Sequence, residues 1–131
     1  MHVLDTCVIV DFLRGNALAI NKIQKLIDTN QQIAITTLTV CELYKGVYLS
    51  SRSAIEEAKL DSFISTIEVI SLDIASSKLY GKYHYLMQKA GNKTQEIDLL
   101  IGCISIIANA TFVTCNIKHY NKIPNIKLVS Y

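Results

Sequence analysis

Residues 1–15, MHVLDTCVIVDFLRG, carry the clearest signal of the fold. Its first five residues are mostly apolar and end on an aspartate, which predicts a short buried β-strand. A turn at Thr6 then leads into a short helix that we expect to end near Arg14, with Gly15 as its C-terminal stop. The chain therefore opens with a strand that passes directly into a helix, and Asp5 stands at the junction.

The remaining sequence continues this alternation without a linker, a repeat or a low-complexity stretch. Four further strands are predicted at residues 32–36, 67–70, 111–114 and 126–129. Helices are expected between them, with starts at Asn16, at Thr37 or Thr39, at a capping box formed by Ser53 and Glu56, at Asp73 and at Asp98. Strands that alternate with helices form a parallel sheet covered on both faces, so the sequence predicts the α/β class.

The composition fits one folded domain. The chain has 131 residues, half of them hydrophobic, and a mean hydropathy of +0.29, which is enough to bury a sizeable core. The net charge of +2 is too small to identify a nucleic-acid binder, so contacts with RNA must come from local patches. The most apolar stretch, residues 99–113, is interrupted by polar residues and is shorter than the roughly 20 residues of a membrane span. We expect a cytoplasmic protein with no membrane contact.

Cysteine occurs at positions 7, 41, 103 and 115, with no C-x-x-C pair. We expect no signal peptide, because the N-terminus enters a strand at once. Free thiols in a reducing cytosol are the expectation. Cys7, Cys41 and Cys115 each lie within two residues of a candidate site position, so a thiolate metal site is one alternative. Small, buried apolar side chains are the other.

Polar residues are concentrated where a parallel sheet binds ligands, beyond the carboxyl ends of its strands. Asp5 ends the first strand, and Glu42 lies one to two turns into the helix after the second. Asp98 begins the apolar helix that leads to the fourth strand, which closes with Thr114 and Asn116. We expect these side chains to converge on one edge of the sheet.

Carboxylates that converge must be compensated. At about 4 Å and an effective dielectric constant of about 20, a like-charged pair costs about 4 kcal/mol. Such a site needs a bound cation or a raised pKa. Oxygen ligands favour Mg²⁺ or Mn²⁺, which activate water and stabilise the reacting oxygens of a phosphodiester.

Several of these residues also have structural interpretations that the sequence leaves open. Asp98 suits a helix cap, Glu42 follows Thr39 at capping-box spacing, and Asp5 suits a turn. His119 is either a general acid near a leaving oxygen or an exposed histidine with no orienting partner.

The basic residues also have both a functional and a structural interpretation. Arg14 and Lys45 are placed either to bind a phosphate or simply to be solvated. Residues 78–89, KLYGKYHYLMQK, mix lysine with tyrosine. This mixture suits RNA binding, and it equally suits an amphipathic helix that buries its tyrosine stems.

Four segments, taken in order, resemble PIN-domain nucleases, especially toxins of the VapC type. The first is LDTCVIVDFLRG at residues 4–15, which resembles their opening. TVCELYKGV at 39–47 resembles their E-L-x-x-G helix, and IDLLIG at 97–102 resembles their D-x-x-I-A segment. VTCNIKHYNKI at 113–123 resembles their T-x-N-x-x-x-F segment. Order, spacing and overall length match over nearly the whole chain.

The resemblance implies a three-layer α/β/α sandwich with a five-stranded parallel sheet, forming a single PIN-like nuclease domain over residues 1–131. It implies a ribonuclease that depends on Mg²⁺ or Mn²⁺, with Asp5 and Asp98 as metal ligands and Glu42 as the third acid. We expect Glu42 to position or deprotonate water and Asn116 to orient a ligand or the phosphate. The residues expected to contact the substrate are Thr6, Arg14, Lys45 and Thr114.

The resemblance also implies partners: a homodimeric toxin of a type II toxin–antitoxin module, blocked by a VapB-type antitoxin that inserts a segment into the cleft. DNA would be contacted only through the antitoxin. The chain departs from the family at Cys7, where Asn is common, and at Asn116 and His119, where one acid is often found. One metal ion is therefore the expectation.

Two rival functions are considered. The first is a regulatory or binding protein on the same fold, with weak or no nuclease activity, acting through an antitoxin–DNA complex. The second is a phosphoryl-transfer or receiver domain, which the sequence disfavours because no second aspartate follows two residues after Asp5.

Overall fold

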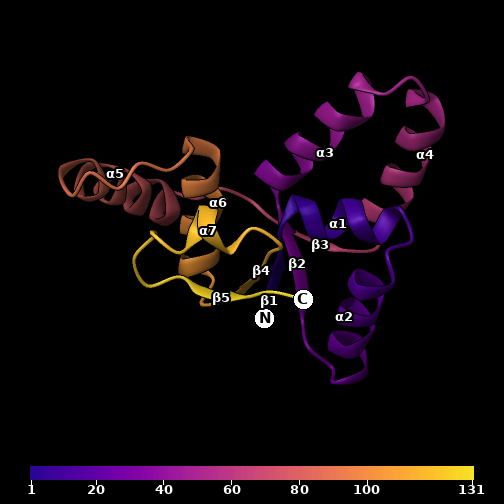
Figure 1. Cartoon of the computed structure of the whole chain (residues 1–131), viewed down its shortest axis with the longest axis horizontal. Helices are drawn as coiled ribbons and strands as arrows, with labels where there is room; N and C mark the ends of the chain where they lie inside the picture. Colours follow the sequence, from indigo (N-terminus) through magenta and orange to yellow (C-terminus); the bar gives the residue numbers. More distant parts are fainter.

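A five-stranded parallel sheet forms the centre of the computed structural model, which describes all residues 1–131. Its strands are β1 (His2–Leu4), β2 (Ile33–Thr36), β3 (Glu68–Ile70), β4 (Thr111–Val113) and β5 (Lys127–Val129). They lie in the order β3-β2-β1-β4-β5, and every pair is parallel (Figure 1). The predicted α/β class and all five predicted strands are confirmed, each within about two residues of its expected bounds.

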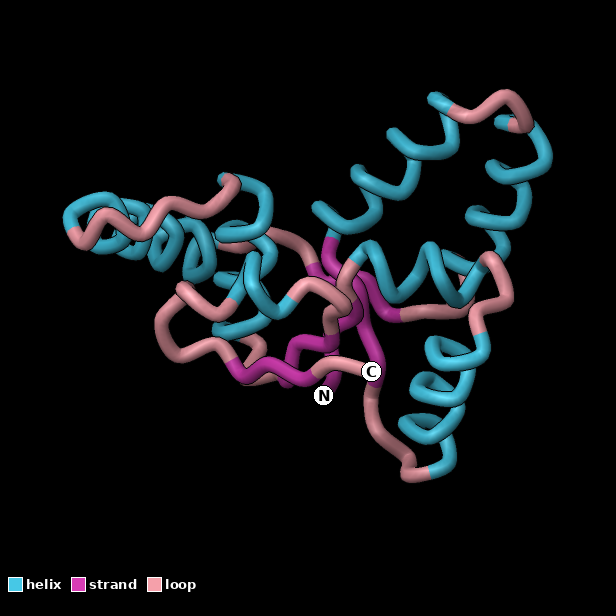
Figure 2. The backbone as a smooth tube through the Cα atoms, in the orientation of Figure 1, coloured by secondary structure: helices cyan, strands magenta, loops and turns pink.

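Seven helices surround the sheet. They are α1 (Thr6–Leu13), α2 (Ala17–Asp28), α3 (Thr37–Leu49), α4 (Ser53–Ile64), α5 (Ile74–Lys89), α6 (Glu96–Ile107) and α7 (Ile117–Tyr120). In Figure 2 the helices lie on both sides of the strands, with α5, α6 and α7 on one side and α1 and α2 on the other.

The two faces of the sheet carry separate hydrophobic cores, because successive residues of a strand point to opposite faces. Val3 and Phe112, which are paired between β1 and β4, belong to the core under α5, α6 and α7. Leu4 and Val113, the next pair along, belong to the core under α1 to α4. The predicted three-layer α/β/α sandwich is therefore confirmed.

Most of the predicted helix boundaries are observed. Asn16 caps α2 by accepting from the backbone N–H groups of its first turn, and Asp73 caps α5 in the same way. Gly15 follows α1 with a φ of +81°, a left-handed conformation that suits glycine. The predicted capping box at Ser53 is wrong, because α4 begins at Ser53 itself and its N-cap, Arg52, makes no side-chain hydrogen bond.

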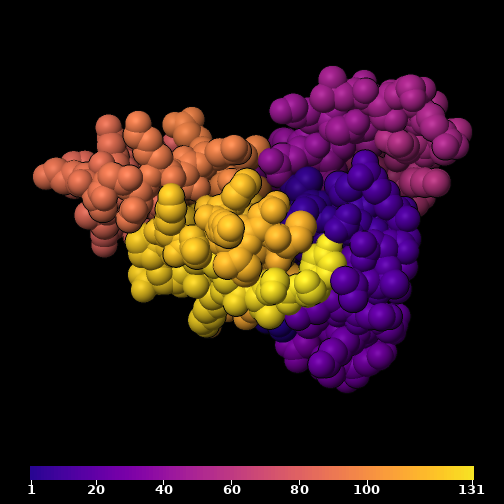
Figure 3. Space-filling view, viewed as in Figure 1, coloured from indigo at the N-terminus to yellow at the C-terminus, as the bar shows by residue number.

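The chain reverses its direction of travel across the sheet between β1 and β4. It first runs from β1 outwards to β2 and β3, and later returns to β4 on the other side of β1 before ending at β5. In Figure 3 the two halves of the chain stand side by side as a consequence. The carboxyl ends of β1 and β4 thus meet at a topological switch point, where ligands bind in this class of sheet.

No helix combines the length and the apolar character that crossing a bilayer requires.

Candidate active site

Asp5 lies at the switch point, as the first residue after β1 and the N-cap of α1, and is only 4% exposed. Its Oδ1 accepts from the backbone N–H of Thr6 at 2.8 Å and from the hydroxyl of Tyr120 at 3.1 Å. Its Oδ2 accepts from the hydroxyl of Thr114 at 2.6 Å. Burial raises the pKa of Asp5, although these hydrogen bonds favour the ionised form. The carboxylate is held in one orientation, and no lysine or arginine forms an ion pair with it.

Asp98 faces the same place from the other side of the switch point. It is the third residue of α6 and 7% exposed, and the N-cap of that helix is Gln95, so the capping interpretation of Asp98 is wrong. Its Oδ1 accepts from the hydroxyl of Tyr120 at 3.2 Å, and its Oδ2 lies 3.5 Å from Nδ1 of His119. Burial raises its pKa, and the negative charge of Asp5 adds to this effect.

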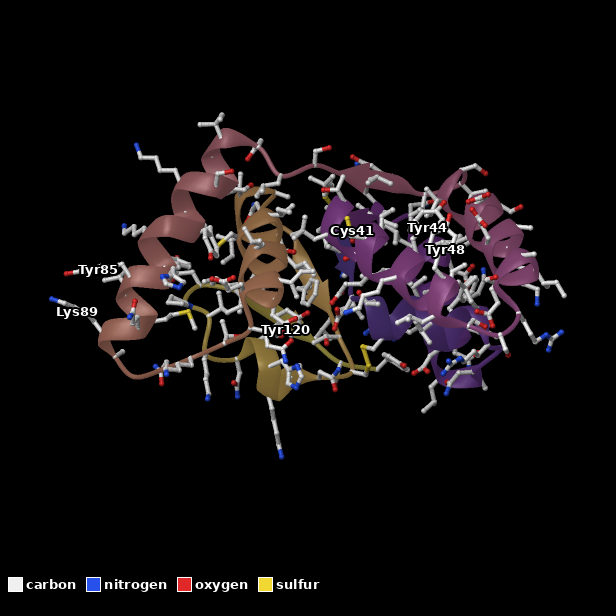
Figure 4. The ribbon with its side chains drawn as sticks, turned by 90° about the horizontal axis from the view of Figure 1, so that it is seen from above. Cys41, Tyr44, Tyr48, Tyr85, Lys89 and Tyr120 are labelled. Carbon is white, nitrogen blue, oxygen red and sulfur yellow. A yellow bond between two sulfur atoms is a disulfide. The ribbon has the colours of Figure 1, made fainter.

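Tyr120, at the end of α7, joins the two carboxylates through one hydroxyl group. Its side chain is 2% exposed, and its ring packs against Phe112 of β4 at a centroid distance of 4.6 Å. Figure 4 shows it near the middle of the molecule. Burial, followed by the charges of Asp5 and Asp98, raises the pKa of Tyr120 and keeps it protonated. Tyr120 was not predicted as a site residue, although it lies in the fourth matching segment at the position where the family pattern has Phe.

Glu42 completes a set of three carboxylates. It stands in the second turn of α3, and its Oε2 accepts from the hydroxyl of Thr6. The N-cap of α3 is Thr36, whose hydroxyl accepts from the backbone N–H of Thr39, so Thr39 is not the cap and the capping-box interpretation of Glu42 is wrong. Burial raises the pKa of Glu42, and the charges of the other two carboxylates raise it further.

The three carboxylates line one pocket of about 410 Å³, which we call the acidic pocket. Its lining residues are Asp5, Thr6, Cys7, Val10, Asp11, Glu42, Gln95, Asp98, Cys115, Asn116, His119 and Tyr120. No three His, Cys, Asp or Glu side chains are arranged to hold a metal ion by themselves. The donors that could hold an ion are therefore the two carboxylates that share Tyr120, with water completing the shell. This donor set suits Mg²⁺, which binds through one or two carboxylates and keeps several waters.

The other predicted site residues occupy different positions around this pocket. Asn116 lines it, and the backbone N–H of Asn116 donates to the hydroxyl of Thr114 at 2.9 Å. Thr6 also lines it, whereas Thr114 is fully buried beneath Asp5. Arg14 lines a neighbouring pocket, and Lys45 is exposed on α3 and lines neither of the two.

His119 has a partner that the sequence did not reveal. Its Nδ1 faces Asp98, and its backbone carbonyl accepts from the hydroxyl of Thr94 at 3.1 Å. The imidazole is half-exposed on the rim of the acidic pocket, where it is accessible to substrate.

The expectation of four free thiols is wrong. Cys7 and Cys115 form a disulfide, and only Cys41 and Cys103 are free. Because β1 and β4 are neighbours in the sheet, the start of α1 and the segment after β4 lie side by side, and the two Cα atoms are 6.3 Å apart across a sequence separation of 108. Neither sulfur is free to bind a metal, so the thiolate site is also wrong. The disulfide borders the acidic pocket, with Sγ of Cys7 lying 3.4 Å from Oδ2 of Asp5.

Comparisons with known proteins agree with this architecture. Ribonuclease VapC2 of Rickettsia felis is 31% identical over 131 residues, which cover all of this chain and 98% of that protein. Ribonuclease VapC19 of Mycobacterium tuberculosis is 29% identical over 129 residues, which cover 97% of this chain and 98% of that protein.

Two solved structures extend the comparison. A chain in the crystal structure of VapBC2 from Rickettsia felis, bound to a DNA fragment from its promoter, superposes with a TM-score of 0.92 at 31% identity, covering 99% of this chain and 98% of that one. DNA-bound VapBC from Salmonella typhimurium shares the fold, with a TM-score of 0.88 at 22% identity over 98% and 96% of the two chains. A model of the PIN domain family matches residues 2–123. The chain belongs to the PIN domain family.

Proposed function

We propose that the chain is a divalent-metal-dependent endoribonuclease, working as a single domain over residues 1–131, and the toxin of a toxin–antitoxin pair. The observation that carries the chemistry is the meeting of Asp5 and Asp98 on one tyrosine hydroxyl, in a pocket that also contains Glu42. RNA as the substrate is supported by the curated relatives, which are named ribonucleases.

The metal is inferred because the buried carboxylates have no cationic side chain that fully compensates their charge. Asp5 and Asp98 are almost fully buried, and burial raises the pKa of both because the charged forms are poorly compensated. We infer that Mg²⁺ or Mn²⁺ binds to these two residues. A bound ion would supply Lewis acidity toward a phosphodiester oxygen and lower the pKa of a coordinated water.

The surrounding side chains provide for proton transfer and orientation. Glu42 is half-buried at the pocket wall, and its raised pKa suits a group that takes a proton from the attacking water. We infer that His119, on the rim beside Asp98, protonates the leaving oxygen, and its distance of 3.5 Å from Asp98 supports this role. Asn116 offers an uncharged amide to the phosphate from the same rim.

A protein antitoxin is inferred from the neighbouring surface. A second pocket of about 410 Å³ lies among α1, α3 and α4, and it shares Val10 and Glu42 with the acidic pocket. Half of its lining residues are hydrophobic, and Arg14, Glu56 and Lys59 supply charge. Such a groove suits a segment with apolar anchors, and an occupant that reaches Glu42 would obstruct the active site. The VapBC structures of related proteins support this partner, and support DNA binding by the complex. Homodimerisation stays a prediction.

The proposal is tested by incubating RNA with the purified chain in EDTA and across a titration of Mg²⁺ or Mn²⁺. We expect cleavage only with the metal. Asp5→Asn should lower the rate more than about a hundredfold, because several kcal/mol of transition-state stabilisation are lost with the ion. Asp28→Asn, which removes an exposed carboxylate at the end of α2, is the control with the same change of charge and should cleave normally.

Circular dichroism establishes that both variants are folded. Metal-independent cleavage, or cleavage by Asp5→Asn at the rate of the unmodified chain, contradicts the proposal. Absence of cleavage at every metal concentration favours the alternative of a regulatory binding protein.

A further inference from the structure

A second polar pocket adjoins the active site and has no assigned role. It has a volume of about 400 Å³, and no hydrophobic residue lines it. We call it the lysine pocket, and its lining residues are Lys93, Thr94, Gln95, Asp98, Lys118, His119 and Lys122. They come from the loop before α6, the first turn of α6, and α7 with the turn that follows. The hydroxyl of Thr94 donates to the carbonyl of His119, which ties the two sides of the pocket together.

The lysine pocket is continuous with the acidic pocket. Gln95, Asp98 and His119 line both. A molecule that reaches the carboxylates from this side therefore passes directly over the lysines.

The three lysines are not neutralised within the protein. Neither of the two ion pairs in the structure involves a lysine, and no side chain of Lys93, Lys118 or Lys122 donates a hydrogen bond. The one carboxylate in the lining, Asp98, is engaged with Tyr120 and faces His119. The positive lysine pocket thus adjoins the negative acidic pocket. The two groups of charge largely cancel in the net charge of +2, so the net charge does not reveal them.

We propose that the lysine pocket binds the RNA backbone at phosphates next to the one that is cleaved, and so fixes the path of the strand across the carboxylates. This inference rests on the proposed ribonuclease function, because only a polyanion held at the carboxylates has further phosphates in reach of the lysines. Lysine side chains act as point charges on phosphate. No aromatic side chain for stacking on bases lines the pocket except the imidazole of His119. The pocket therefore contributes affinity without sequence preference.

The sequence offers a rival RNA surface, the Lys–Tyr segment of α5. Tyr83 of that segment is buried, and Nζ of Lys89 lies 5.2 Å from the ring centroid of Tyr85. In Figure 4, Tyr85 and Lys89 lie at one end of the molecule, whereas Tyr120 lies near its middle. Lys78 and Lys82 are exposed and line neither the lysine pocket nor the acidic pocket.

The test compares two triple variants that remove the same charge. In an Asp5→Asn background, chosen to prevent cleavage, one variant carries Lys93→Gln, Lys118→Gln and Lys122→Gln. The other carries Lys78→Gln, Lys82→Gln and Lys89→Gln. Binding of a fluorescent single-stranded RNA is measured by anisotropy over a series of salt concentrations.

We expect the lysine-pocket variant to bind at least tenfold more weakly at low salt. The slope of log Kd against log salt concentration should fall by about 2, since each phosphate contact on a single strand contributes about 0.7. The α5 variant should keep the slope of its parent, and the loss in the lysine-pocket variant should be the same for RNAs of different sequence.

An unchanged slope in the lysine-pocket variant, or an equal loss in the α5 variant, overturns the inference. Because binding is measured without cleavage, this experiment tests the lysine pocket independently of whether the chain is a ribonuclease. Salt-dependent RNA binding through the lysine pocket by a chain that never cleaves would contradict the nuclease proposal alone.

Discussion

Tyr120 has one proton to donate, yet its hydroxyl oxygen lies within hydrogen-bond distance of both Asp5 and Asp98. At any moment only one of the two carboxylates accepts this proton, and the other either receives no hydrogen bond from Tyr120 or is itself protonated. The hydroxyl therefore brings the two groups together without balancing their charge. This agrees with the raised pKa of both residues and with a site that is completed by a cation.

Replacing Tyr120 by Phe tests this role, because the ring can still pack on Phe112 while the hydroxyl is lost. In EDTA we expect the free energy of unfolding to fall by about 1.5–3 kcal/mol, the range for hydrogen bonds to charged groups. With saturating Mn²⁺ the loss should shrink, because the ion then satisfies the carboxylates. Denaturant unfolding under both conditions provides the measurement.

Tyr83→Phe is the matched control. Tyr83 is 6% exposed, and its hydroxyl accepts from Asn125 away from the acidic pocket. Its loss of stability should be the same with and without Mn²⁺. If the loss in the free energy of unfolding of Tyr120→Phe is also the same with and without Mn²⁺, a link between this hydroxyl and a metal site is contradicted.

At this scale the sequence predicted the residues that local rules can identify. Asp5 follows β1, Glu42 lies in the helix after β2, and Asp98 lies in the first turn of the helix that leads to β4, so the order of strands and helices was enough to nominate them. Tyr120 and the disulfide of Cys7 with Cys115 depend on contacts across 115 and 108 residues. No local pattern specifies such contacts, because they arise only when β1 and β4 become neighbours.

The helices that carry the acids begin at positions the sequence only partly predicted. Gln95 caps α6 without a side-chain hydrogen bond, and the helix starts two residues before the predicted Asp98. Both Glu96 and Asp98 then fall in the first turn, where negative charge is favourable beside the helix dipole. Propensity alone does not distinguish a cap from a first-turn acid, so this boundary required the packed structure.

The cap of α3 holds the helix that presents Glu42. The hydroxyl of Thr36, which is fully buried, accepts from the backbone N–H of Thr39 at 3.0 Å. Thr36→Val keeps the shape of the side chain and removes this acceptor, so we expect a loss of about 1–2 kcal/mol in the free energy of unfolding. Chemical denaturation measures it.

Thr36→Ser keeps the hydroxyl and loses one methyl group, so it serves as the control for packing. It should be more stable than Thr36→Val. If Val proved the better tolerated of the two, the capping hydrogen bond would not stabilise the start of α3.

At the scale of the whole molecule, the order of strands determines where the site lies. The alternation of strands and helices predicted a parallel sheet, and the family resemblance implied five strands in three layers. The reversal between β1 and β4 then brings residues from β1, α3, α6 and α7 to one edge. The charge distribution was not predictable in the same way, because the lysine pocket and the acidic pocket are assembled from separate segments.

The concentration of carboxylates makes stability depend on pH. Burial raises the pKa of Asp98 in the folded state, so the folded protein favours the protonated form. Its contribution to stability is present below the ordinary pKa of an aspartate and is lost as pH rises through the raised pKa. Without metal, Asp98→Asn should therefore be more stable than the unmodified chain at pH 7, and the advantage should shrink toward pH 4.

Denaturant unfolding at both pH values, in EDTA, measures this difference. Saturating Mn²⁺ at pH 7 should reverse it, because the ion stabilises the ionised carboxylate. An advantage of Asp98→Asn that stays constant with pH would mean that Asp98 is not an uncompensated acid in the metal-free protein.

We infer that Asp5 and Asp98 together hold one divalent ion, and that cleavage of RNA requires this ion. The most direct measurement is anomalous diffraction from crystals of the chain grown with Mn²⁺. We expect a single anomalous peak in the acidic pocket, within about 2.0–2.3 Å of a carboxylate oxygen of each residue and otherwise coordinated by water. A peak elsewhere, or none between these two residues under conditions in which the same preparation cleaves RNA, would contradict it.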